Sequence, residues 1–334
     1  MVFASALAIA NATPVLATHE PPRLGLTPLG ETGSFFNLTL DAGEAADLHV
    51  EVANFGHAEL MARTFSADVY SIINGGFGAE LFGERSSGAT HWVDYPAQEI
   101  ALGPAERVVI NFSVSVPART PPGEYITSLV AENVEPYQGA EGGDMAMEQV
   151  NRTALAVAID VPGIREPALA IGAVGHKAAA GTSFLSFEVR NPGDVHLKPA
   201  GEFVLRDAAG RGLAQAPAVM DSVYAGSQTL FEAPLATVLA PGEYCAELSL
   251  TDAETGAADG TECRPFTVGE PAPDVEGGDR GATTAALELD VNGVFGGRLP
   301  AALISGIALS VVIILLLRRR RRESTQGRLP PVAR

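Results

Sequence analysis

Short runs of alternating apolar and polar residues, separated by Gly, Pro, Asn and Asp, cover most of the chain before residue 269. In DLHVEVANFG (47–56), the leucine and the two valines share one face, and the aspartate, histidine and glutamate share the other. RVVINFSVSVP (107–117) and FFNLTL (35–40) alternate in the same way. A period of two indicates a strand with one buried face, and no segment in this region sustains a helical period. The sequence therefore predicts an all-β fold.

Two parts of this region resemble each other. HVEVANFGHAEL (49–60) is matched by SFEVRNPGDVHL (186–197), each an alternating strand followed by Asn-x-Gly. Farther along, TPPGEYITSLVAE (120–132) is matched by APGEYCAELSLTD (240–252). These landmarks lie farther apart in the first copy, and we expect the additional residues within 70–98. The repeat predicts two copies of one β unit.

Each copy contains Pro-Gly-Glu-Tyr, with Tyr125 or Tyr244 opening the next strand. A tyrosine at the start of strand F that bonds back to the preceding turn is the tyrosine corner of Greek-key β-sandwiches. An ordinary type II turn, repeated by chance, would give the same letters. Because the upstream strand repeats as well, we predict two immunoglobulin-like β-sandwich domains in tandem. They occupy residues 18–162 and 163–268, with Tyr125 and Tyr244 as structural tyrosine corners.

The chain has two cysteines, Cys245 and Cys263, and both lie in the second copy. In YCAELSL the tyrosine, alanine and leucines share one face, so Cys245 points the other way. In TECRPFTV, Cys263 likewise lies opposite the face of the phenylalanine and valine. This alternation predicts a cross-strand disulfide on the outer face of the last hairpin, and two free thiols are the alternative. A disulfide would fit an oxidising compartment.

The segment LPAALISGIALSVVIILLL (299–317) carries no charge and is followed at once by five arginines. As a helix it would reach about 28 Å, close to the ~30 Å hydrocarbon core of a bilayer. A buried core helix is the alternative, but the arginine cluster marks the cytoplasmic end of a membrane span. We predict a transmembrane helix at 299–317 and a basic cytoplasmic tail at 318–334. The Pro-, Gly- and acid-rich stretch 269–298 is predicted to be a flexible stalk.

Residues 1–17 contain a short apolar run and a small-residue cleavage site before Thr18, but no basic region. We predict a signal peptide there, because a domain followed by a stop-transfer helix needs export. The chain is then a single-pass type I protein of the cell membrane, with its N-terminal domains extracellular. Within the span, small residues recur every fourth position, a spacing that would allow helices to pack together and the chain to form a homodimer, although such stripes are common. These residues are Ala302, Gly306 and Ser310.

The formal net charge is −18, and the tail 318–334 opposes it with seven arginines and one glutamate. The remainder of the chain is therefore strongly acidic, which excludes nucleic acid as a partner held by charge. Lysine occurs only at positions 177 and 198, whereas arginine, alanine and glycine are abundant. This usage is typical of a GC-rich genome and indicates a bacterium.

Catalytic motifs are missing. The six histidines form neither HExxH nor another close metal-binding pair. Neither G-x-S-x-G nor a P-loop is present. INGGFGAELFG is glycine-rich but lacks the lysine of a phosphate loop, so a hairpin loop is the better interpretation. The sequence predicts a protein that is not an enzyme and that holds no metal and no cofactor.

Aromatic residues offer candidates for ligand binding. Trp92, the only tryptophan, lies in THWVDYP with Tyr95, and close in sequence to Tyr70 and Phe77. Exposed aromatic rings at a sandwich edge bind glycans and peptides by stacking and burial. The simpler interpretation, which we prefer, is that Trp92 fills the core of its sheet.

Several segments of residues 33–135 together resemble a known family. FFNLTLDAGEAADLHVEVANFG is followed by FSADVYSIINGGFGA, by HWV and by LGPAERVVINFSVSVPARTPPGEYITSLV. This order resembles the peptidoglycan-binding domain of WxL-interacting cell-surface proteins. A second β domain, one membrane span and a basic tail match the usual order of that family. The resemblance implies that the first domain binds peptidoglycan or WxL-type surface proteins, and that the second contacts host or other surface ligands.

These observations predict a membrane-anchored, non-catalytic binding protein of the bacterial cell surface. Its expected ligand is cell-wall peptidoglycan or a wall-associated partner protein. Two other functions stay open: an accessory or structural subunit of a membrane complex, and an adhesin for host ligands.

Overall fold

The computed structural model describes residues 21–138 and 148–269. These residues form twenty strands and one short 3-10 helix, which confirms the all-β prediction. No helix in this part of the chain is long and apolar enough to cross a membrane. Several predicted features lie outside the described residues: the signal peptide (1–17), the stalk (269–298) apart from Gly269, the span (299–317) with Ala302, Gly306 and Ser310, and the tail (318–334).

The first sandwich has two facing sheets. The first two strands go to different sheets: β1(Leu24–Leu29) pairs antiparallel with β3, and β2(Phe36–Thr39) pairs parallel with β12. One sheet has the order β1(Leu24–Leu29), β3(Ala45–Asn54), β8(Arg107–Ser115), β6(Val93–Asp94). The other has the order β2(Phe36–Thr39), β12(Arg152–Val161), β9(Gly123–Asn133), β4(Leu60–Ser71), β5(Phe77–Ala79), with β7(Gln98–Leu102) also on β4. The ribbon β10(Tyr137–Gln138), β11(Glu148–Gln149) is separate.

The core of this sandwich lies between the inner faces of the two sheets. Val50 and Val52 of β3 are fully buried and lie opposite Ile110 and Val108 of β8. From the other sheet, the buried ring of Phe36 meets a phenylalanine of β8 edge-on, with ring centroids 5.2 Å apart. Alternation along each strand thus places the apolar residues inward, as in other packed sheet pairs.

The second sandwich begins after the linker 162–169, and both sandwiches belong to one compact unit of the chain. Its core contains the fully buried Phe187, Leu185 and Leu248. One sheet has the order β13(Ala170–Ala179), β14(Thr182–Arg190), β17(Gln228–Pro234). The other has the order β16(Gly212–Val219), β15(Ala200–Asp207), β18(Gly242–Thr251), β19(Ala258–Gly260), with β20(Arg264–Val268) also on β18.

The two sandwiches repeat the same buried asparagine. Asn54 ends β3, and Asn191 follows β14. Each side chain accepts a hydrogen bond from the backbone two residues on and donates to the carbonyl four residues on. Each amide also donates to a distant carbonyl, that of Leu102 at the end of β7 or that of Val223. The repeated Asn-x-Gly motif therefore corresponds to the same set of side-chain hydrogen bonds, which holds the following loop in place in both sandwiches.

Both tyrosines of the repeated Pro-Gly-Glu-Tyr motif donate a hydrogen bond to a carbonyl four residues upstream. The Tyr125 hydroxyl lies 2.9 Å from the oxygen of Pro121, and the Tyr244 hydroxyl lies 2.8 Å from that of Ala240. This is the hydrogen bond that defines a tyrosine corner.

The first sandwich carries additional structure between its repeated landmarks. Residues 72–106 separate β4 from β8, whereas only residues 208–227 separate the corresponding strands β15 and β17. The longer connection contains β5, the 3-10 helix η1(Gly88–Trp92), β6 and β7. Part of it packs on the outer face of the β9–β4 pair, where Phe77 adds to a small second core. The outer face of the sheet is therefore covered over this pair of strands.

Cys245 and Cys263 form the predicted disulfide. Cys245 is on β18, Cys263 directly precedes β20, and their Cα atoms are 5.2 Å apart. Ala246, the neighbour of Cys245, is fully buried, whereas both cysteines are half-buried. The bridge therefore lies off the core face of the last strands, as the alternation predicted.

Replacing both cysteines by alanine should lower the free energy of unfolding by about 3 kcal/mol, because the open chain regains loop entropy in the unfolded state. Urea unfolding of the full-length chain measures this loss, and reduction of the unmodified protein should reproduce it. An unfolding midpoint that moves in neither case would contradict a stabilising role for the bridge.

Candidate functional site

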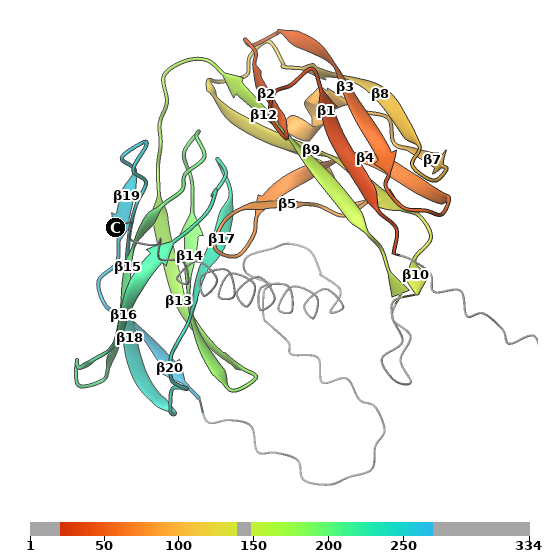
Figure 1. The fold of residues 1–334 in the computed structure, drawn as a ribbon. Coiled ribbons are helices and arrows are strands. Elements are labelled where there is room, and N and C mark those ends of the chain that lie inside the picture. Colours follow the sequence, from red (N-terminus) through yellow and green to blue (C-terminus); the bar gives the residue numbers. More distant parts are fainter. Residues whose placement is uncertain (1–20, 139–147, 270–334) are drawn as a thin grey trace, which may run out of the picture. The chain divides into compact units, whose positions relative to one another are not determined.

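The tip of the β4–β5 hairpin, residues 72–76, lies against β17, an edge strand of the second sandwich (Figure 1). The backbone N–H of Asn74 donates to the oxygen of Leu230 at 2.8 Å. The Asn74 side chain donates to the carbonyl of Glu232 at 2.9 Å and accepts from its N–H at 2.7 Å. Asn74 therefore makes, on the free edge of β17, the hydrogen bonds that a neighbouring strand would make.

The glycines of this hairpin have a structural role. Asn74, Gly75 and Gly76 all have positive φ, at 64°, 78° and 107°. A Cβ on Gly75 would lie 2.2 Å from the backbone oxygen of Asp221. The backbone of Asp221 donates to Asn74, and Gly76 donates to the carbonyl of Ser222, both at 2.8 Å. The run INGGFG is thus a hairpin, as expected, and it fastens one sandwich to the other.

A second contact between the sandwiches centres on Glu124, at the start of β9. Its N–H donates to the oxygen of Asp194 at 2.7 Å. Its carboxylate accepts from the backbone N–H of His196 at 2.7 Å and from the ring Nδ1 at 2.6 Å. Close by, Arg165 of the linker forms an ion pair with Asp160 at the end of β12. The loop 194–196 is therefore tied to the first sandwich by backbone and side chain together.

Glu124 and His196 each shift the titration of the other. Burial alone would raise the pKa of Glu124, but hydrogen bonds from the ring and backbone of His196, with the charges of His196 and Arg165, lower it below its ordinary 4.5. The hydrogen bond to Glu124 raises the pKa of His196 above its ordinary 6.5, although burial and the charge of Lys198 oppose this. Both shifts favour the charged pair.

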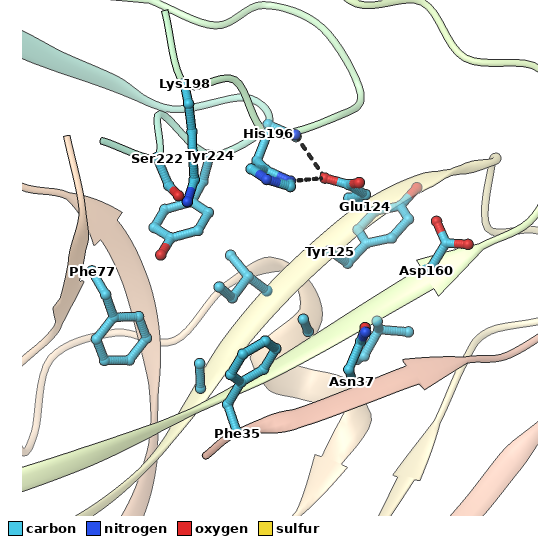
Figure 2. Close-up of a pocket in the computed structure, with 15 residues that line it drawn as sticks. Phe35, Asn37, Phe77, Glu124, Tyr125, Asp160, His196, Lys198, Ser222 and Tyr224 are labelled. Carbon is cyan, nitrogen blue, oxygen red and sulfur yellow. Dashed lines mark hydrogen bonds and ion pairs between the residues drawn. The ribbon is translucent and has the colours of Figure 1, made fainter. Parts of the chain in front are cut away.

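Residues beside the two contacts line a cavity of about 470 Å³ (Figure 2). Its floor is the outer face of the β2–β12–β9 sheet, where Ala156 and Ala158 of β12 lie next to Ile126 of β9. Aromatic rings stand around this floor in Figure 2: Phe35, Phe77, Tyr125 and Tyr224. The small alanine side chains leave space above the sheet that larger residues would fill.

Polar groups reach the cavity from both sandwiches. The second sandwich supplies His196, Lys198 and Ser222, and the first supplies Asn37 and Asp160. The Lys198 ammonium lies 3.4 Å from a carboxylate oxygen of Asp221. A mostly apolar hollow with a few polar groups at its edge is the usual form of a ligand-binding site.

The structure places the four aromatic residues that the sequence suggested for ligand binding in different environments. Phe77 lines the cavity. Trp92 is half-buried on η1, where it packs against the core of the first sandwich and on Tyr125, with ring centroids 4.6 Å apart. Tyr70 is 40% exposed on β4 and does not line the cavity. Tyr95 is only 5% exposed, and burial raises its pKa; its ring belongs to the core, which corrects its expected place on a binding surface.

Most of the cavity was missed by reasoning from the sequence. One signal was present in RTALAVAIDV (152–161), where alanines alternate with the large core residues. A strand that is apolar on both faces has something packed or bound on each of them. Glu124, His196 and Lys198 carried no local signal, since they meet only when the two sandwiches dock.

The arrangement is suited to binding. No group of three or more His, Cys, Asp or Glu side chains in residues 21–138 and 148–269 is placed to hold a metal ion. The two carboxylates of the cavity each have a partner: Glu124 is bonded to His196 and Asp160 to Arg165. What the site offers a ligand is an apolar floor, aromatic edges and hydrogen bonds.

No family model and no curated protein matches the chain. Among solved structures, the Salmonella enterica SafA pilin in complex with the SafB chaperone is similar at 10% identity and a TM-score of 0.31, over 74% of this chain and 96% of that one. The Escherichia coli chaperone DraB is similar at 9% identity and a TM-score of 0.30, over 75% of this chain and 98% of that one. A PapD-like domain of human CEP192 is similar at 13% identity and a TM-score of 0.28, over 47% of this chain and 99% of that one. Likeness at these scores carries no information about a ligand.

Proposed function

We propose that this chain is a non-catalytic, membrane-anchored binding protein of the bacterial cell surface, which holds cell-wall peptidoglycan or a wall-associated protein in the cavity. The observation that carries the proposal is the cavity itself. Both sandwiches build it, and hydrogen bonds on two sides of it fix them together.

The lining supports an extended polymer as the ligand. Ala156 and Ala158 allow the flat face of a sugar ring or a peptide unit to approach the sheet closely. Aromatic rings such as Phe35, which is 44% exposed, provide stacking surface at the edge of this floor. Hydrogen-bonding side chains beside the rings would fix the orientation of the polymer.

Anchoring would make a weak contact effective. In the proposal, the stretch 299–317 spans the membrane and 269–298 is the tether, so the cavity stays close to the wall. A wall polymer repeats its binding unit many times, and tethering raises the effective concentration of each unit near the cavity. Modest affinity for one unit is then sufficient for retention.

Filling the cavity should abolish retention on the wall. We expect Ala158→Phe in the full-length chain to reduce binding to purified peptidoglycan sacculi at least about tenfold, since a clash of only ~1.4 kcal/mol gives that factor. Ala179→Phe, at an exposed position near the end of β13, is the matched control and should bind normally. Co-sedimentation measures both, and thermal unfolding verifies that both are folded.

Equal binding by the two variants would place the ligand elsewhere. If the unmodified chain is not retained at all, wall-polymer binding is wrong. Crosslinking in membranes then tests the protein-partner alternatives, because an accessory subunit would form a defined heteromer without any wall material.

A further inference from the structure

The hydrogen bond from His196 to Glu124 determines what His196 presents to the cavity. An ionised carboxylate only accepts, so the Nδ1 of His196, 2.6 Å from the Glu124 oxygen, carries the proton. In the neutral ring, Nε2 is then an acceptor. In the protonated ring, Nε2 gains a hydrogen and becomes a donor, while the bond to Glu124 becomes an ion pair.

The imidazole of His196 lies in the cavity wall, so a ligand in the cavity would contact a ring that is either an acceptor or a donor at Nε2 (Figure 2). In the described residues, the His196 side chain forms its hydrogen bond through Nδ1, and Nε2 has no partner there. Lys198 lines the same wall and is close enough to oppose protonation of the ring. When His196 is protonated, that wall therefore presents two neighbouring cationic donors.

Other charged groups around His196 come from several elements. Glu124 of β9 and Glu254 of the β18–β19 turn favour its protonation, and Lys198 of its own loop opposes it. Arg165 of the linker acts on Glu124. Asp194 lies in the same loop, Asp160 lies on the floor side and is paired with Arg165, and Asp221 is paired with Lys198.

The titration of the pair defines a pH window. His196 has a raised pKa, so the stability that its charge adds to the folded state is complete below its ordinary pKa of 6.5 and is lost as pH rises through the raised pKa. Glu124 has a lowered pKa, so the stability that its charge adds is complete above its ordinary pKa of 4.5 and is lost as pH falls through the lowered pKa. The charged pair is therefore fully formed between pH 4.5 and pH 6.5.

We propose that Glu124 and His196 make binding in the cavity depend on pH, with the protonated His196 donating from Nε2 to a carboxylate or carbonyl oxygen of the ligand. The inference rests on the proposed function, since it concerns the same cavity. Glu124 is the positioning residue, because it fixes the proton on Nδ1 and joins the two walls. His196 is the residue that contacts the ligand.

The test is retention of the full-length chain on purified sacculi between about pH 8 and about pH 5.5. We expect affinity to rise about tenfold on acidification, the worth of one added charge-assisted hydrogen bond. In His196→Gln, the amide can still donate to Glu124 but does not titrate, so the rise should disappear. In Glu124→Gln, the ring loses its anion, so the midpoint should move to lower pH.

His57→Gln is the matched control, because His57 is exposed and lies outside the cavity lining; its profile should equal that of the unmodified chain. Sacculi whose carboxyl groups have been amidated separate the two acceptors. A rise that persists on them identifies a carbonyl, and a rise that is lost identifies a carboxylate. Binding without pH dependence, or the same profile in His196→Gln, would overturn the inference and leave the proposed function intact. No binding at any pH would overturn the proposed function.

Discussion

Replacing Gly75 by alanine should uncouple the two sandwiches, whereas replacing Gly83 should not. Both glycines have positive φ, at 78° and 86°, so both variants carry the ~1–2 kcal/mol that an L residue pays in this conformation. Only at Gly75 does the new Cβ meet backbone, at 2.2 Å from the oxygen of Asp221. At Gly83 it has nothing within 4 Å.

The contact at Gly75 cannot be relieved by a side-chain rotation, because Asp221 presents its backbone. The hairpin would have to withdraw, which breaks the hydrogen bonds of Asn74 with Leu230, Glu232 and Asp221, and that of Gly76 with Ser222. At about 1 kcal/mol for each bond, the loss should exceed ~3 kcal/mol beyond that of the control.

Calorimetry of the full-length chain measures the effect. The unmodified protein and Gly83→Ala should each unfold in one transition, and Gly75→Ala should show two, one for each sandwich. Gly75→Ala should also lose binding in the cavity, since both sandwiches build it. Equal behaviour of the two variants would mean that the hairpin contact does not hold the sandwiches together.

The substitution Asn54→Asp should be among the most destabilising that keep side-chain shape. The Asn54 amide is fully buried and donates to the carbonyls of Ala58, Leu102 and Gly103 at 2.8, 3.1 and 3.0 Å. A carboxylate there would direct an oxygen at three other oxygens. We expect a loss of about 3–5 kcal/mol, the cost of an uncompensated buried charge.

The sign of its pH dependence distinguishes this mechanism from a simple loss of packing. Burial among carbonyls raises the pKa of the new carboxyl group above its unfolded value, so the loss should shrink as pH falls and the group regains a donor. Asn111→Asp is the control, because Asn111 is exposed on β8 and contacts His49. It should change stability by less than about 0.5 kcal/mol. Chemical unfolding of both variants at two pH values gives the comparison.

The parts of the fold that local pattern determines were predictable from the sequence. Alternation placed Val50, Val52 and Phe36 in the core, and all three are fully buried. The repeated motifs predicted two sandwiches, and strand faces predicted the disulfide of Cys245 with Cys263. Each of these inferences needs only the periodicity of a strand and the chemistry of a turn.

The junction and the cavity could not be predicted in this way. Asn74 bonds to Glu232, 158 residues away, and Glu124 bonds to His196, 72 residues away. No periodicity links such positions, because their pairing depends on how two finished domains dock. Tyr95 shows the converse: its neighbours suggested a surface, but the chain turns its ring into the core.

The hairpin on β17 also has a consequence for self-association. A strand edge and the segment that covers it are both present in every copy of the chain. Were the hairpin to leave β17, it could cover the edge of a second copy, whose own hairpin would then be free for a third. Reciprocal exchange between two copies would give a closed dimer, and head-to-tail exchange that does not close would give an open-ended fibre. Pairing of the hairpin with β17 of its own chain prevents both kinds of assembly.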